Sequence, residues 1–80
     1  MNTLTMILTE VKDKYPAQPQ KIEYLFASNA DFRSICLDYS FCKQSISKLK
    51  QEFVDKKDAI MDFEQMIHEL ENEMKLFIEK

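Results

Sequence analysis

The sequence predicts an all-α protein, a small antiparallel helical bundle built on a long C-terminal helical hairpin with one or two short helices before it. The 80 residues include no glycine, and the tight turns of β-hairpins depend on pairs such as Asn-Gly. Apolar side chains recur every three or four positions, which is the spacing of one helix face. Both prolines fall in the first quarter of the chain, so neither proline nor glycine interrupts a helix after them. A chain of this length has room for one hydrophobic core, and we expect residues 1–80 to form a single domain.

Two short helices are expected first, over residues 4–14 and 19–27. Pro16 ends the first helix, because the residue before a proline is pushed out of helical geometry. The second proline can begin the next helix, since its missing N–H costs nothing in a first turn. Ser28 or Asn29 can then cap the helix that follows. The inward faces of these two helices consist of Leu4, Ile7, Leu8, Val11 and Tyr15, and of Ile22, Leu25 and Phe26.

From residue 30 onward, apolar side chains repeat every seven positions, and two structures can produce this pattern. One is a continuous helix of about fifty residues, roughly 75 Å long, in a coiled coil. The other is a hairpin of two helices, over about 30–54 and 58–79, that turns near residues 54–58. The pattern consists of Phe32, Tyr39, Ile46, Phe53, Ile60, Ile67 and Met74 at one position, and of Ile35, Cys42, Leu49, Lys56, Phe63, Leu70 and Phe77 at the other.

The distribution of charge favours the hairpin. Residues 43–57 carry five lysines and two acids, a net charge of +3, whereas residues 58–73 carry six acids and neither lysine nor arginine, a net charge of −6. A break between them places lysines at the negative C-terminal end of one helix and acids at the positive start of the next. Folding back also brings the basic end beside the acidic beginning, and it puts Lys56, the one polar member of the pattern, in the turn.

Composition excludes several functional classes. The net charge of −3 argues against a nucleic-acid partner, which usually requires a basic excess. The lysines near the predicted turn do not form one patch, because Lys48 and Lys50 diverge by about 200° on a helix. The absence of glycine excludes Gly-rich phosphate loops and nucleophile elbows. No eighteen apolar residues run together to span a membrane, and no basic leader precedes an apolar segment, so we expect a cytoplasmic protein.

Side chains that could carry catalysis or bind a metal are few. Cys36 and Cys42 lie about 240° apart around one predicted helix, so they cannot form a disulfide with each other. We expect them to be small buried apolar residues of a reducing compartment. Glu64, His68 and Glu71 share one helix face and are the candidate metal ligands, although the second Glu-x-x-His unit of a bundle site is missing. We therefore expect no enzyme and no cofactor, and we assign no catalytic residue.

A second apolar pair, Leu37 and Phe41, lies on the third predicted helix away from its main stripe. This pair can receive the first two helices or a partner. Because small bundles often associate to bury enough surface, the sequence predicts a non-enzymatic helical module for protein–protein interaction or regulation, with a homodimer as one form. The alternative is a metal- or ligand-binding module that uses Glu64, His68 and Glu71, and a nucleic-acid accessory role ranks third.

Two segments, DFRSICLDYSFC at residues 31–42 and HELENEM at residues 68–74, resemble a pattern of short, uncharacterised bacterial helical proteins. In such proteins a segment that opens with Phe-Arg and contains an acid–Tyr pair leads into one arm of a hairpin, and a Glu-Leu-Glu-x-Glu segment closes the other arm. The resemblance implies a helical hairpin. It implies no activity, cofactor or binding residue.

Overall fold

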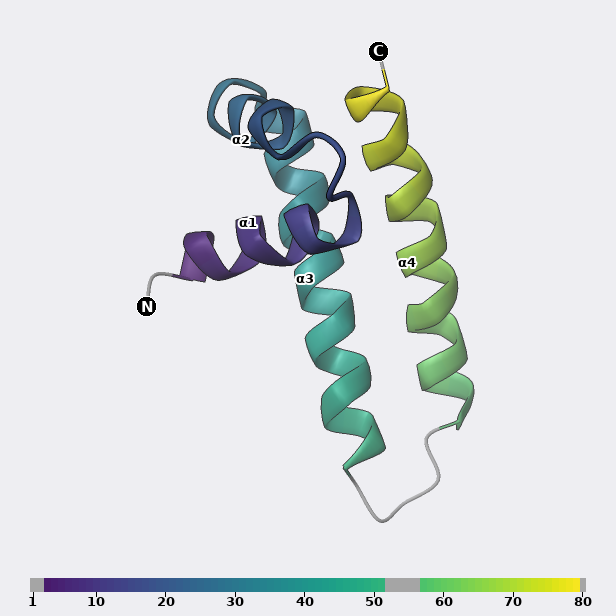
Figure 1. The fold of residues 1–80 in the computed structure, drawn as a ribbon. Helices are drawn as coiled ribbons and strands as arrows, with labels where there is room; N and C mark the ends of the chain where they lie inside the picture. Colours follow the sequence, from purple (N-terminus) through teal and green to yellow (C-terminus); the bar gives the residue numbers. More distant parts are fainter. Residues whose placement is uncertain (1–2, 52–56, 80) are drawn as a thin grey trace.

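The computed structural model describes residues 3–51 and 57–79, which form four α-helices and no strand (Figure 1). The prediction of an all-α fold is confirmed. The longest dimension is 41 Å, far less than the roughly 75 Å of a continuous fifty-residue helix, and Figure 1 shows the last helix returning antiparallel to the one before it. The helices are α1 (Thr3–Lys14), α2 (Pro19–Ser28), α3 (Ala30–Lys50) and α4 (Lys57–Ile78).

The helix boundaries agree with the prediction to within one residue, except at the end of α3. The sequence predicts that this helix continues to residue 54, whereas α3 ends at Lys50. The N–H of Gln51 donates to the carbonyl oxygen of Lys48, three residues back, at 3.1 Å. Such a short-range bond tightens and closes a last helical turn. Of the turn predicted near residues 54–58, residues 54–56 lie outside the described residues.

The contact between α3 and α4 is the most extensive in the molecule, and it buries the seven-residue pattern. The rings of Phe32 and Phe77 meet edge to face with their centroids 5.7 Å apart, a favourable arrangement of aromatic quadrupoles. Phe53 and Lys56 lie outside the described residues, and every other member is buried or partly buried. The buried members are Phe32, Tyr39, Cys42 and Met74.

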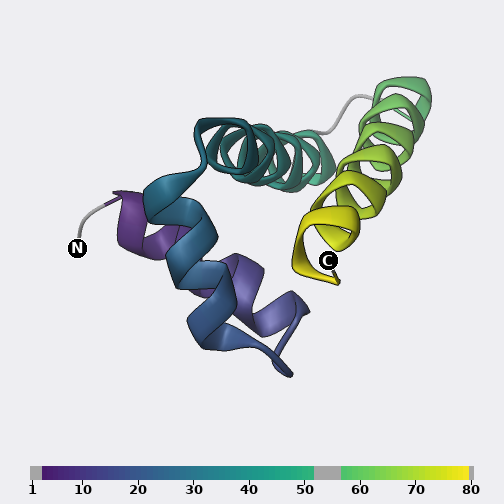
Figure 2. The same cartoon turned by 90° about the horizontal axis from the view of Figure 1, so that it is seen from above.

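The first two helices pack together on one side of this hairpin (Figures 1 and 2). In Figure 1, α1 crosses α3 and α2 lies near the start of α3. Their inward faces are the predicted ones except at Leu4, which is 46% exposed near the start of α1. The spacing of three and four aligns the other apolar residues along each helix. The resulting core cluster consists of Ile7, Val11, Ile22, Phe26, Phe32, Cys36, Tyr39, Met74 and Ile78.

Polar contacts fix the corner between α2 and α3. The side-chain oxygen of Asn29 accepts a hydrogen bond from the N–H of Phe32 at 3.0 Å, which confirms Asn29 as the cap of α3. The guanidinium of Arg33 reaches back and donates to the carbonyl oxygens of Phe26 at 2.9 Å and Ala27 at 3.2 Å. A cation at this position also satisfies the negative C-terminal end of α2.

The side of the hairpin opposite α1 and α2 has no covering helix in the part of the chain that the structure describes (Figure 2). That side holds the candidate site. Within the same residues, no helix combines the length and the hydropathy that crossing a membrane requires.

Candidate functional site

The uncovered side of the hairpin is hollowed between α3 and α4 into a groove of about 250 Å³, which we call the hairpin groove. The contacts with α1 involve the other flank of α3, where Ser40 lies about 200° around the helix from Asp38. The lining residues are spaced by three and four along each helix, so they share one face. They are Asp38, Phe41 and Cys42 from α3 and Met66, Glu69, Leu70 and Glu73 from α4.

Phe41 is the most accessible apolar side chain of the hairpin groove, with 64% of its surface exposed. One edge of its ring is held against Phe63 of α4, with centroids 6.4 Å apart. Leu37, which the sequence paired with Phe41, is 39% exposed and does not line the groove. The first two helices therefore leave both side chains accessible, and only Phe41 faces the hollow between the helices.

A second hollow continues the hairpin groove toward the C-terminal end of α4. Its lining consists of Ile35, Glu73, Leu76 and Phe77, and its volume is about 410 Å³. Glu73 borders both hollows. Together they extend from Met66 to Phe77, about 16 Å along α4 at the rise of an α-helix. The uncovered side thus offers an elongated apolar depression and not a closed cavity.

Three carboxylates, those of Asp38, Glu69 and Glu73, border the hairpin groove. No lysine, arginine or histidine of the described residues lines either hollow. None of the three carboxylates makes an ion pair in the described part of the chain. Glu69 and Glu73 also repel each other, because residues four apart are neighbours on a helix. The groove therefore combines an apolar floor with an uncompensated negative rim.

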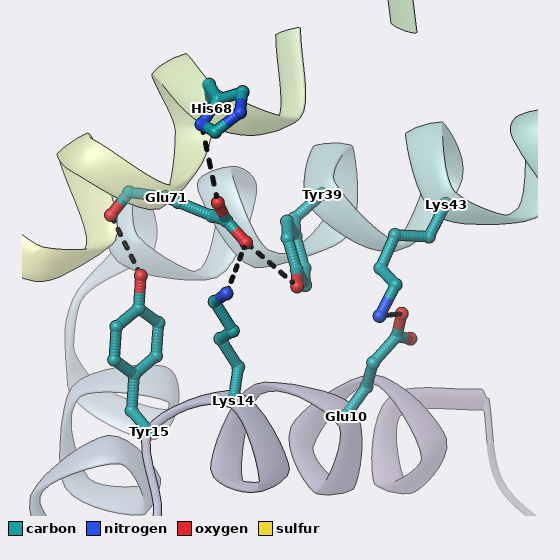
Figure 3. Close-up of polar contacts among 7 residues, drawn as sticks. All are labelled: Glu10, Lys14, Tyr15, Tyr39, Lys43, His68 and Glu71. Atoms are coloured by element: carbon teal, nitrogen blue, oxygen red, sulfur yellow. Dashed lines mark hydrogen bonds and ion pairs between the residues drawn. The ribbon is translucent and has the colours of Figure 1, made fainter. Parts of the chain in front are cut away.

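Three carboxylates at the contacts of α1 with the other helices are, in contrast, paired with lysines. Lys12 contacts Glu23 at 2.7 Å, and Lys43 contacts Glu10 at 3.5 Å (Figure 3). The hydroxyl of Ser40 donates to the other oxygen of Glu10 at 3.3 Å. These contacts tie α1 to α2 and to α3, and they neutralise charge there.

Glu71 is the centre of a polar cluster that joins α1, α3 and α4 (Figure 3). The ammonium of Lys14 lies 3.1 Å from its Oε2, and the hydroxyl of Tyr39 donates to the same oxygen at 3.4 Å. The hydroxyl of Tyr15 donates to the backbone carbonyl oxygen of Glu71 at 3.0 Å. Burial and the nearby Glu71 carboxylate raise the pKa of both tyrosines, so both hydroxyls remain donors. This cluster positions helices.

The candidate metal ligands Glu64, His68 and Glu71 do not form a metal-binding group. His68 is directed to solvent, with 83% of its side chain exposed, whereas Glu71 is 18% exposed and turns toward Lys14. The imidazole Nδ1 and the Glu71 carboxylate are 4.0 Å apart. In residues 3–51 and 57–79, no three histidine, cysteine or acidic side chains are placed to hold a metal ion together.

Both cysteines are free and buried. Burial raises the pKa of the Cys36 thiol to about 12. Burial and the neighbouring Asp38 also raise the pKa of the Cys42 thiol. Since the thiolate is the nucleophilic form, these environments suppress the reactivity of both residues at neutral pH.

Arg33 and the lysines near the turn lie at opposite ends of α3. Arg33 is engaged with the last carbonyl oxygens of α2. Lys48 and Lys50 lie in the last turn of α3 and Lys57 begins α4, while Lys56 lies outside the described residues. The structure does not gather these side chains with Arg33 into one surface.

Of the seven residues that line the hairpin groove, the sequence identified only Phe41 as a site residue, and the other six were missed. One signal could have found them. Acids at Asp38, Glu69 and Glu73 flank apolar members of the seven-residue pattern on two helices that were expected to pair. Unless the rotation of each helix about its own axis is known, this spacing does not show whether the acids border the contact between the two helices or form a strip in solvent.

No protein-family model, curated protein sequence or solved structure matches this chain. The resemblance to short bacterial helical proteins therefore stays a prediction.

Proposed function

We propose that this chain is a non-catalytic interaction module that binds a partner protein through the hairpin groove. The observation that carries the proposal is the exposure of Phe41 beside Met66 and Leu70 in an elongated hollow. Exposed apolar clusters with polar rims are characteristic of protein interaction sites. An aromatic anchor and a flexible methionine also suit a surface that adapts to another protein.

A catalytic role has less support, because the side chains that could carry chemistry are either buried or isolated. The thiols of Cys36 and Cys42 are buried, and His68 stands in solvent away from both hollows. The metal-binding alternative has less support for a related reason, since the Glu71 carboxylate is already engaged by Lys14. Two unpaired thiols also support a cytoplasmic location, because reducing compartments keep cysteines free.

The test compares two substitutions on exposed aromatic residues. Phe41→Glu places a charge in the apolar floor of the groove, whereas Tyr24→Glu makes the same kind of change on the exposed surface of α2. Tagged forms of the wild-type chain and both variants are purified from the cells that express the protein. Their copurifying proteins are then identified by quantitative mass spectrometry. We expect a partner that is retained by wild type and Tyr24→Glu and lost by Phe41→Glu.

Light scattering after size exclusion distinguishes a foreign partner from a second copy. A molar mass that stays at the monomer value of 9.5 kDa over about a hundredfold range of concentration identifies the partner as another protein. A dimer that Phe41→Glu dissociates means that the module pairs with itself. The proposal is wrong if wild type is monomeric throughout and recovers nothing that Phe41→Glu loses, while circular dichroism shows both variants folded.

A further inference from the structure

We infer that the occupant of the hairpin groove is a basic amphipathic helix, with apolar residues on one face and lysine or arginine beside them. This inference rests on the proposed function and specifies the chemistry of the partner. Its basis is the combination of an apolar floor with a rim of carboxylates that have no ion-pair partner in residues 3–51 and 57–79. Apolar burial supplies the attraction in such a contact, and charge complementarity selects the partner.

Two further carboxylates lie in line with those that border the hairpin groove. Asp31 lies seven residues before Asp38, and Asp62 lies seven residues before Glu69. Seven residues bring a side chain back to nearly the same face, about 10 Å along the helix. Both residues are exposed. The carboxylates therefore flank the apolar floor on both helices, and a cation on either edge of an inserted helix meets an acid.

The carboxylates at the contacts of α1 with α2, α3 and α4 have ion-pair partners, unlike those that border the hairpin groove. Glu10, Glu23 and Glu71 each have a lysine partner on the side of α1 and α2. Asp38, Glu69 and Glu73 have none among the described residues. Lysines or arginines of a partner would supply the missing counter-charges, and they would relieve the repulsion between Glu69 and Glu73.

The same charges argue against a second copy of this chain as the occupant. In a two-fold symmetric dimer the same patch meets itself. Such a dimer through the groove would place the carboxylates of Asp38, Glu69 and Glu73 near their own counterparts. Like charges at an interface disfavour association. A phosphate backbone is disfavoured for the same reason, so the partner is a cationic protein segment.

The shape of the groove favours a helix as the inserted segment. Its walls are two helices, whose backbone groups bond internally and offer no sheet edge to an extended peptide. A hollow about 16 Å long accepts roughly ten residues, or three turns, of a third helix. Apolar side chains at positions i, i+3 and i+7 of that helix would lie along the floor formed by Phe41, Met66 and Leu70.

The experiment uses synthetic peptides and the full chain. The probe is a fluorescein-labelled peptide of about 14 residues, with leucines at i, i+3, i+7 and i+10 and lysines elsewhere. One control peptide replaces every lysine with glutamate, and another keeps the composition but scatters the leucines. Binding is measured by fluorescence anisotropy at roughly 50 mM and 300 mM salt, since exposed charge pairs weaken as the Debye length shortens.

Two charge reversals separate the groove from the general acidity of the protein. Glu73→Lys changes the border of both hollows, and Asp13→Lys makes the same change in net charge on the exposed surface of α1. We expect one leucine–lysine peptide to bind per chain, with affinity reduced about tenfold or more by Glu73→Lys and less than about twofold by Asp13→Lys. The glutamate and scattered peptides should bind at least about tenfold more weakly.

The inference is overturned if both charge reversals weaken binding equally, because the attraction is then general. It is also overturned if the glutamate peptide binds as tightly as the lysine peptide. The two experiments distinguish failure of this inference from failure of the proposed function. A cellular partner that depends on Phe41, combined with no binding of the leucine–lysine peptide, retains the proposed function and rejects its basic helix. Groove-specific peptide binding without any such partner supports the groove chemistry and rejects the proposed function.

Discussion

Met74 provides the sharpest test of how the hairpin is packed. Its side chain is completely buried in the core between α4 and the other helices, whereas Met61, on the same helix, is 60% exposed. Removing a buried methionine side chain costs about 2–5 kcal/mol, because the transfer of apolar surface and the remaining cavity both contribute. A domain of this size has a total unfolding free energy of about 4–12 kcal/mol. Met74→Ala should therefore remove a large share of the stability, about 3 kcal/mol.

The matched variant is Met61→Ala, which makes the same chemical change at an accessible position. We expect it to change the unfolding free energy by less than about 0.5 kcal/mol. Urea unfolding followed by circular dichroism should show a midpoint about 2 M lower for Met74→Ala than for wild type, since small domains have slopes of roughly 1–2 kcal/mol per M. An equal decrease of the unfolding free energy in the two variants, or a larger decrease in Met61→Ala, would contradict the orientation of α4 that buries Met74 and exposes Met61.

Three further predictions concern a helix cap, a buried thiol and an interhelical hydrogen bond. Asn29→Ala should cost about 1 kcal/mol in urea unfolding because it removes the cap of α3, whereas Gln18→Ala should cost less than about 0.5 kcal/mol, since the Gln18 side chain makes no capping bond. For Cys36, burial raises the thiol pKa from 9.0 to about 12, so its stabilising contribution is fully present below pH 9 and is lost as pH rises toward 12. Between pH 9 and 10, the unfolding free energy measured by thermal and urea unfolding should decrease with pH. The decrease should be smaller in Cys36→Ala than in wild type by up to about 1.4 kcal/mol per pH unit. The same pH dependence in both proteins would contradict the burial of this thiol. Tyr15→Phe should reduce the unfolding free energy by about 1 kcal/mol, because its hydroxyl bridges the end of α1 to the backbone of α4; a neutral result would mean that water replaces this bond.

Local sequence signals were sufficient for the helices themselves. The second proline begins α2, Asn29 caps α3, and the seven-residue pattern identifies the residues between α3 and α4. Each signal acts within one or two helical turns, so it can be read without knowledge of the remaining chain. The segregation of lysines and acids also predicted the reversal of chain direction, because helix dipoles and opposite charges favour it.

The tertiary structure decided which exposed or polar residues act together. The sequence placed Leu37 and Phe41 in one candidate interface, but only Phe41 lines the hollow against α4. It grouped Glu71 with Glu64 and His68. In the structure one oxygen of Glu71 does approach His68 at 4.0 Å, but α1 brings Lys14 to the other oxygen at 3.1 Å.

Helical periodicity defines the angle of a side chain around its own axis, and so it determined the faces of this protein's helices. It does not define which helix approaches that face, at what height, or from which side. Those relations depend on packing between residues far apart in the chain. For this reason the sequence alone indicated the helices and the apolar pattern along which two of them pair. Only the packed structure revealed an apolar groove whose acidic rim has no ion-pair partner among the described residues.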